Sequence, residues 1–113
     1  MDSKLFPVIV VPARLESVRF PKKLLADANG KPLIIRTAER ICEQVPEFEL
    51  YFAVDGNELK NVLEASGHQV ILTNPNLPSG TDRIAEANQV LKKNLVINVQ
   101  ADEPLVDREH ILM

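Results

Sequence analysis

The sequence contains little of several residue types, and each shortage excludes a class of protein. It has a single cysteine, Cys42, in 113 residues, which excludes an internal disulfide framework and a zinc site built from cysteines. Tryptophan is absent and aromatic residues make up 4% of the chain, so the stacking surfaces of single-stranded nucleic-acid binders are missing. Basic residues are outnumbered, 13 against 16 acidic ones. We therefore expect no nucleic-acid partner.

Long hydrophobic runs are also missing. No apolar run approaches the roughly 20 residues that a membrane helix needs, and we expect no membrane association. The first apolar run reaches Pro12 with no small-residue cleavage site, so we interpret it as a strand rather than a signal peptide. With a lone cysteine, this composition fits a reducing, cytoplasmic location.

The chain does contain short apolar runs that alternate with helix-spaced stretches. The runs cover residues 6–11, 50–54, 69–72 and 95–99. Between them, apolar residues recur at steps of three and four, for example at Ile34, Ala38, Ile41 and Val45, and Cys42, on this apolar side, is expected in the core. Leu59, Val62 and Leu63 form a second apolar face, and Gly67 is expected to cap the end of that helix. The alternation predicts an α/β fold, a Rossmann-like and mostly parallel sheet with helices on both faces. The chain closes in DREHILM, which predicts a truncated element.

In such a sheet, every loop that follows a strand emerges at the carboxyl edge, where ligands bind. Four loops, beginning at Pro12, Asp55, Thr73 and Gln100, should therefore share one rim. We interpret Asp55 as a helix cap that pairs with Glu58 in a D-x-x-E arrangement.

The first of these loops is rich in cations. Within ten positions it carries Arg14, Arg19, Lys22 and Lys23 against one acid, Glu16. Arginine offers a planar fork for phosphate oxygens and lysine a point charge, so the loop suits a polyphosphate. Neither standard glycine-rich phosphate motif occurs, and a solvated surface loop is the alternative interpretation.

Two later segments complete the candidate site. In S-G-T-D-R, Ser79 and Asp82 fit a helix capping box, while the same helix start could present amides to a nucleotide, with Gly80 allowing close approach. Asp102 follows the last predicted strand by three residues, where a carboxylate suits Mg²⁺ shared with substrate phosphates. A simple turn is the alternative for Asp102.

Taken together, these motifs resemble the N-terminal half of the 3-deoxy-manno-octulosonate (KDO) cytidylyltransferase family, over nearly the whole chain. The family pattern P-A-R-x-x-S-x-R-x-P-x-K is matched by Pro12, Ala13, Arg14, Ser17, Arg19, Pro21 and Lys23. Its later patterns are matched at residues 30–32 (G-K-P), 79–83 and 98–104. The departures are Lys22 for glycine, Leu24 for proline, Leu77 for histidine and Ala101 for glycine.

The resemblance implies the nucleotide-diphospho-sugar transferase type of fold, with residues 1–113 as the N-terminal nucleotide-binding part of one larger cytidylyltransferase domain. It implies the reaction of CTP with KDO to give CMP-KDO and diphosphate, which serves lipopolysaccharide biosynthesis. The implied cofactor is Mg²⁺, the implied substrates are small molecules, and the full-length protein is expected to be a homodimer.

The resemblance also implies the site residues. The expected nucleotide contacts are Pro12, Ala13, Arg14, Ser17, Arg19, Lys23, Ser79, Gly80, Thr81 and Gln100. Arg14 and Lys23 are expected to contact the triphosphate and to be catalytic together with Asp102, which is also the expected Mg²⁺ ligand.

Two alternatives stay open at this point. One is a sialic-acid cytidylyltransferase, whose opening loop reads closer to P-A-R-x-G-S-K-G; the residues 17–21 and V-Q-A-D-E-P favour KDO instead. The other is a non-catalytic nucleotide-binding fragment.

Overall fold

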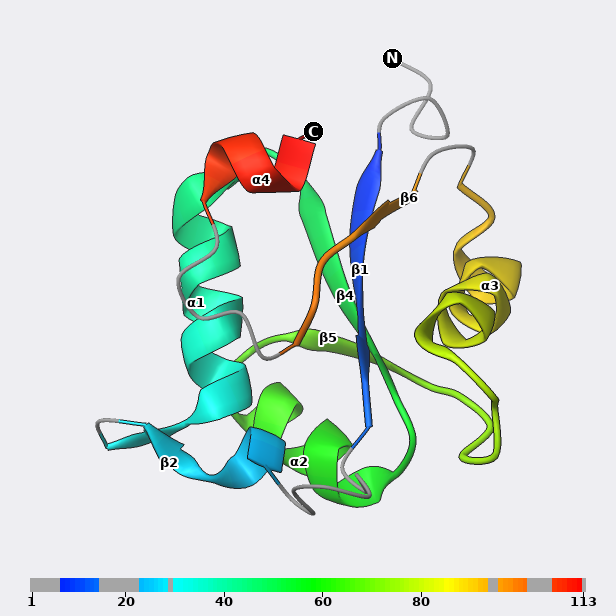
Figure 1. Ribbon diagram of the computed structural model, residues 1–113, viewed down its shortest axis with the longest axis horizontal. Coiled ribbons are helices and arrows are strands. Elements are labelled where there is room, and N and C mark those ends of the chain that lie inside the picture. Colours follow the sequence, from blue (N-terminus) through cyan, green and yellow to red (C-terminus); the bar gives the residue numbers. More distant parts are fainter. Residues whose placement is uncertain (1–6, 15–22, 29, 94–95, 102–106, 113) are drawn as a thin grey trace.

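The sheet at the centre of the molecule is parallel. The computed structural model describes residues 7–14, 23–28, 30–93, 96–101 and 107–112, with the backbone alone for Lys23, Ala28 and His110. Within these residues, four strands pair in the order β5-β4-β1-β6 (Figure 1). They are β1 (Val8–Ala13), β4 (Glu49–Val54), β5 (Gln69–Leu72) and β6 (Val96–Asn98). The predicted parallel α/β sheet is confirmed.

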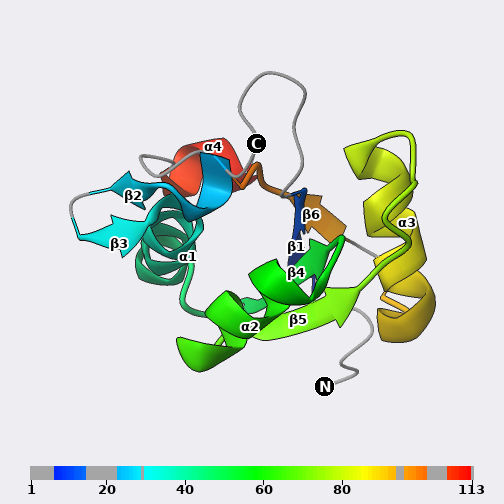
Figure 2. The ribbon, with the colours of Figure 1, turned by 90° about the horizontal axis from the view of Figure 1, so that it is seen from below.

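Helices cover both faces of this sheet, also as predicted. Helices α1 and α2 lie on one side and α3 lies on the other, which Figures 1 and 2 show from two directions. None of the helices in the described part of the chain has the length and apolar character needed to cross a bilayer. The helices are α1 (Leu33–Gln44), α2 (Asn57–Ala65), α3 (Gly80–Leu91) and α4 (Arg108–Leu112), and a 3-10 turn η2 (Lys23–Leu25) and a small hairpin of β2 (Asp27–Ala28) and β3 (Lys31–Pro32) precede α1.

Strand β1 supplies side chains to two separate packing layers. Ile9 and Val11 belong to the cluster that α1 and α2 cover, whereas Val8 and Val10 pack with Ala87 of α3. All four of these strand residues are fully buried. A parallel sheet with helices on both faces buries every strand residue, so the run is apolar throughout instead of alternating with polar residues.

Helix α1 buries one stripe, and the predicted stripe is correct. Ile34, Ala38, Ile41 and Val45 are each at most 1% exposed. The prediction that Cys42 lies in the core is wrong, because its side chain is exposed. Position 42 follows Ile41 by one residue, which turns it by about 100° away from the stripe.

The predicted end of α2 is confirmed at Gly67. This glycine has φ +86°, a left-handed conformation that residues with a Cβ rarely adopt. Its N–H donates to the Glu64 carbonyl at 3.0 Å, and the N–H of His68 donates to the Leu63 carbonyl at 3.0 Å. These paired bonds are those of a Schellman motif and satisfy the last carbonyls of the helix.

The end of β1 differs from the sequence-based prediction. The strand continues through Pro12 and Ala13, which pair with Ala53 and Val54 of β4, so the loop begins at Arg14. Proline is tolerated there because the carbonyl of Val10 faces β6, and the missing N–H of Pro12, two residues on, faces the same way. The described pairing with β6 ends at Val10, so no ladder bond is lost.

We expect the buried stripe of α1 to dominate stability. Ile41→Ala should lower the free energy of unfolding by about 2–5 kcal/mol, because it removes buried methylenes and leaves a cavity. Val90→Ala, a comparable truncation in α3 at a side chain 69% exposed, should change it by less than about 0.5 kcal/mol. Urea denaturation followed by circular dichroism measures both, and similar losses in the two variants would contradict this placement of the core.

Candidate functional site

The carboxyl ends of the strands form one edge, as predicted. Ala13 pairs with Val54 at the end of β1 and β4, and Val54 pairs with Leu72 at the end of β5. The loops that follow therefore leave the sheet together at Arg14, Asp55 and Thr73. Gln100 follows β6 and is exposed. We call this edge the carboxyl rim.

The start of α3 packs directly against the end of β1. A Cβ placed on Gly80 would lie 3.4 Å from Cγ of Pro12, so the ring of Pro12 lies close to the backbone of Gly80. Pro12 and Gly80 belong to motifs that are far apart in the sequence, and the fold brings them side by side. The first-turn amides of a helix have no intrahelical partners, so α3 presents donors next to the end of β1, where Arg14 follows.

The predicted N-cap at Ser79 is confirmed, although Asp82 bonds the Ser79 hydroxyl and not, as in a full capping box, the Ser79 backbone N–H. The backbone N–H of Asp82 donates to Oγ of Ser79 at 3.2 Å, and the Ser79 hydroxyl donates to Oδ2 of Asp82 at 2.7 Å. Ser79 has extended φ and ψ values and α3 begins at Gly80. The Ser79 side chain thus has a structural role in the protein, while Gly80 and Thr81 are exposed beside it.

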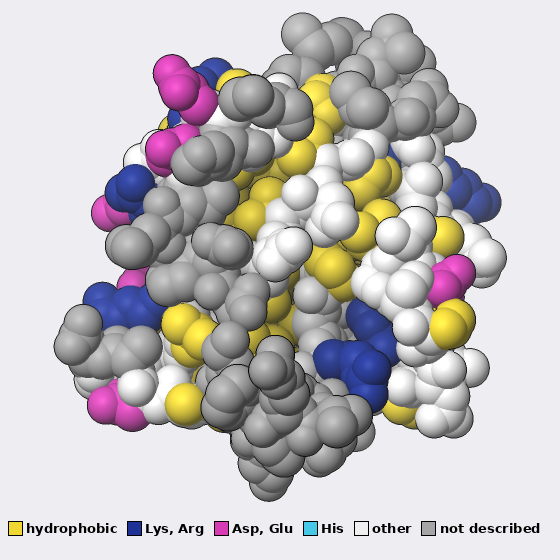
Figure 3. Space-filling model, viewed as in Figure 1, with side chains coloured by type: hydrophobic (Ala, Val, Ile, Leu, Met, Phe, Trp, Pro, Cys, Tyr) yellow, Lys and Arg dark blue, Asp and Glu magenta, His cyan; other side chains and the backbone are white. Residues whose placement is uncertain are grey.

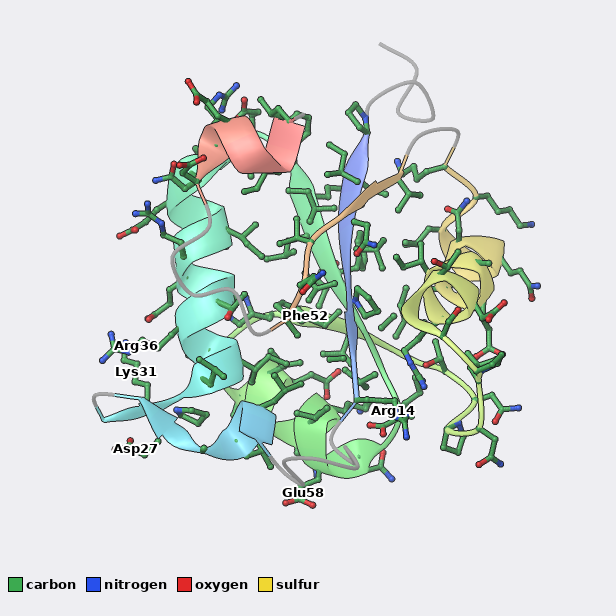
Figure 4. The ribbon with its side chains drawn as sticks, viewed as in Figure 1. Arg14, Asp27, Lys31, Arg36, Phe52 and Glu58 are labelled. Carbon is green, nitrogen blue, oxygen red and sulfur yellow. The ribbon has the colours of Figure 1, made fainter. Side chains whose placement is uncertain are left out.

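Arg14 stands at the end of β1 with its side chain exposed. Figure 4 labels it at the carboxyl rim, and Figure 3 shows Lys and Arg side chains gathered on that part of the same face. Lys31, from the G-K-P segment, lies well away from Arg14 in Figure 4 and forms an ion pair with Glu39 at 2.6 Å instead. Of these two cations, Arg14 is therefore the one available at the rim.

A buried arginine lies behind this surface. Arg83, from the first turns of α3, is 2% exposed. Its Nη1 donates to Oγ1 of Thr73 at 2.6 Å and to the carbonyl of Asn74 at 3.1 Å. Its Nη2 is buried without a hydrogen-bond partner among the described residues, which costs about 1–3 kcal/mol for an ordinary buried donor.

Neighbouring charges act on the guanidinium of Arg83. Burial lowers its pKa most, the nearby Arg14 lowers the pKa further, and the carboxylates of Asp55 and Glu86 raise it. An arginine stays protonated at neutral pH in any protein environment, so Arg83 is a buried cation whose charge is influenced by two acids and a second cation.

Arg83 and Asp55 are absent from the sequence-derived list of site residues. The interpretation of Asp55 as the N-cap of α2 is wrong, because the N-cap residue is Gly56, one position later. A signal for Arg83 was present, since it precedes Ala87 and Leu91 at steps of four on the apolar side of α3. An arginine at such a position packs its stem against the apolar face and either buries its charged head or extends it to the edge of that face.

Several predicted residues lie outside the described part of the chain. These are Ser17, Arg19 and Asp102, and of Lys23 only the backbone is described, in η2. No group of three or more His, Cys, Asp or Glu in the described residues is arranged for a metal ion. Mg²⁺ that is held mainly by substrate phosphates and water needs only one or two carboxylates. Asp102, the next residue after the described Ala101, offers that donor type.

Two departures from the family pattern point inward. Leu24 and Ala101 are each 7% exposed and belong to the core cluster beneath α1. The side chain of Leu24 and the methyl group that Ala101 has and glycine lacks therefore lie in the interior. They do not obstruct the surface of the rim.

The known proteins that are similar to this chain are cytidylyltransferases. A family model described as cytidylyltransferase matches residues 8–113. The 3-deoxy-manno-octulosonate cytidylyltransferase of Chloroherpeton thalassium is 47% identical over 104 residues, which is 92% of this chain and 42% of that protein. The chain thus spans well under half the length of the curated relatives it matches.

Solved structures agree with the fold described above. The structure of CMP:2-keto-3-deoxy-manno-octonic acid synthetase complexed with CTP superimposes with a TM-score of 0.86 at 36% identity, covering 92% of this chain and 43% of that one. A cytidylyltransferase from Leptospira borgpetersenii has a TM-score of 0.77 at 16% identity, covering 93% and 45% of the two chains, and shows the fold alone.

The capping bonds of Ser79 predict a stability effect that is independent of any ligand. Ser79→Ala should lower the free energy of unfolding by about 1 kcal/mol, because it leaves the Asp82 amide without its acceptor. Ser79→Asn, which keeps a side-chain oxygen for that amide, should stay close to the wild-type value. Thermal and urea unfolding without nucleotide measure both variants, and an unchanged Ser79→Ala protein would refute the structural role.

Proposed function

Because the chain belongs to the cytidylyltransferase family, we propose that it forms the nucleotide-binding half of an enzyme that joins CTP and KDO to give CMP-KDO and diphosphate. The observation that carries this proposal is the contact between Pro12 and Gly80, which brings the end of β1, where Arg14 follows, beside the helix start of S-G-T-D-R. The relatives named as KDO cytidylyltransferases support KDO over a sialic acid as the sugar.

The described residues suit the two ends of a nucleotide. Arg14, exposed at the end of β1, would bind the triphosphate with Lys23, and Ser17 and Arg19 would lie in the same loop. Gly80 and Thr81 would approach the cytidine from the start of α3, together with Gln100 after β6. Pro12 and Ala13 would set the spacing between these two groups.

In the proposed reaction, the anomeric hydroxyl of KDO attacks the α-phosphorus in line. The new oxygen–phosphorus bond forms as the bond to diphosphate breaks, and the hydroxyl proton is lost. In such transfers the protein contributes positioning and stabilisation of charge rather than covalent chemistry. Arg14 and Lys23 would stabilise the negative charge that develops on the leaving diphosphate.

Mg²⁺ is the proposed cofactor, and Asp102 is the residue of this chain that would hold it. When bound, Mg²⁺ would neutralise phosphate charge during the transfer. We further propose that the complete enzyme is a cytoplasmic homodimer in the lipopolysaccharide pathway, with residues 1–113 as part of one larger domain. The relatives extend well beyond the length of this chain, and the sugar site is proposed to involve that further part.

Base selection tests the cytidine assignment. With Mg²⁺ present, CTP should raise the melting temperature of the protein more than equal concentrations of ATP, GTP or UTP do. At a hundred times the dissociation constant, bound CTP adds about 2.7 kcal/mol of stability. Equal shifts with all four nucleotides would indicate a phosphate site without base recognition. The product assay on the complete enzyme, with KDO replaced by sialic acid as control, tests the sugar.

The cationic loop makes a second prediction for the complete enzyme. Arg14→Ala and Lys23→Ala should each lower kcat about a hundredfold or more, because a cation that holds the leaving group gains strength in the transition state. Lys22→Ala is the matched control and should change kcat/KM only a few-fold, with the effect fading at high salt. Steady-state kinetics at two ionic strengths measures all three. If Lys22→Ala proves the most damaging at both, the assignment of Lys23 is wrong.

A further inference from the structure

Arg83 is a buried cation that is not among the proposed nucleotide contacts. At 2% exposure it is one of the largest fully buried side chains among the described residues. Guanidinium groups usually keep their charged head in water, because burying a charge is costly unless its donors are bonded. The burial of this head therefore calls for a specific function.

One half of the guanidinium holds a loop in place. Nη1 donates to Oγ1 of Thr73 and to the carbonyl of Asn74, and the Thr73 hydroxyl donates in turn to the Val54 carbonyl at 2.8 Å. Glu86, one turn later on α3, accepts from the Asn74 backbone N–H at 2.6 Å. The loop after β5 is thereby attached to both α3 and the end of β4, and the orientation of the Arg83 head is fixed.

The other half has a donor to spare. Nη2 is buried and lacks a hydrogen-bond partner among the described residues. Native proteins rarely leave a buried donor unbonded, so such a donor calls for an explanation, for example a catalytic or binding role or a bound water or ion. The head lies at the carboxyl rim, since its Nη1 partners follow β5 and Arg14 and Asp55 are close enough to act on its charge.

We propose that Nη2 of Arg83 donates a hydrogen bond to an oxygen of the nucleoside part of bound CTP, either the base carbonyl or the ribose 2′ hydroxyl. This inference rests on the proposed function. It adds a binding residue for the same site and explains why the S-G-T-D-R segment ends in an arginine that folds inward.

The surrounding charges favour a neutral oxygen over a phosphate as the acceptor. Asp55 and Glu86 already supply negative charge beside the Arg83 head, and they would repel a polyanion brought to the same point. Arg14 is exposed at the end of β1, so its guanidinium is better suited to bind phosphate. The two arginines would thus bind opposite ends of one nucleotide.

Isothermal calorimetry with two probes, CTP and inorganic tripolyphosphate, tests this division. Arg83→Lys keeps the charge but has no second amino group, so it should weaken CTP binding about tenfold or more while changing tripolyphosphate binding less than twofold. Arg40→Lys on α1, outside the site, is the matched control and should bind both probes as the wild type does. Thr73→Val, which removes one Nη1 acceptor and leaves Nη2 in place, should weaken CTP binding less than Arg83→Lys does.

Each outcome decides the matter. Unchanged CTP binding by Arg83→Lys would overturn the inference and leave the proposed function standing, as would an equal loss for CTP and tripolyphosphate. An equal loss in Thr73→Val and Arg83→Lys would also overturn it, because both would then act only through the loop. A wild-type protein that binds neither probe would refute the proposed nucleotide site itself, and the inference with it.

The two oxygen sources are separated by 2′-deoxy-CTP. If the acceptor is the 2′ hydroxyl, the wild type should prefer CTP over the deoxy compound and Arg83→Lys should abolish that preference. If it is the base carbonyl, the variant should lose affinity for both compounds by the same factor.

A measurement on the wild type covers the case in which Arg83→Lys does not fold. The side-chain N–H resonances of Arg83 in a ¹⁵N-labelled protein should shift on addition of CTP and remain in place with tripolyphosphate. Resonances that respond to neither probe, in a protein whose other signals show CTP binding, would overturn the inference.

Discussion

The parallel pairing of β1 with β4 is the constraint on which the rest of the molecule depends. Six consecutive pairs, from Val8 with Glu49 to Ala13 with Val54, bring the two strands to the same edge at the same point. Parallel strands must be joined by crossovers, so the loops that follow them all leave at that edge. The position of Arg14 and of Asp55 follows from this register. So does the position of α3, whose first residue contacts Pro12.

Two arginines at this edge show how environment assigns different roles to one residue type. Arg14 is exposed, and water screens its charge until a ligand displaces that water. Arg83 is buried among hydrogen-bond partners and carboxylates, so its geometry is set before any ligand arrives. The first is suited to attract a polyanion, and the second to hold a donor in a defined orientation. Their closeness lets one rim accept both ends of a nucleotide.

Features that depend on local sequence were predicted well. The stripe of Ile34, Ala38 and Ile41, the left-handed turn at Gly67 and the cap at Ser79 each involve residues within about one or two turns, so their spacing contains the information. Predictions that depend on a partner elsewhere in the chain were less reliable. Pro12 was assigned to a loop, although the limited pairing with β6 allows it in a strand.

The sequence by itself determined the fold class, the family resemblance and the cationic character of the first loop, because hydrophobic period, motif spacing and charge are local properties. Only the tertiary structure decided that Arg83 turns inward to Thr73 and Asn74, that Asp55 lies near enough to act on its charge, and that Cys42 is exposed. The reason is physical. Whether a side chain contacts water, a carbonyl group or another charge depends on elements that are distant in the chain. Those elements come together only when the strands pair and the helices pack against the sheet.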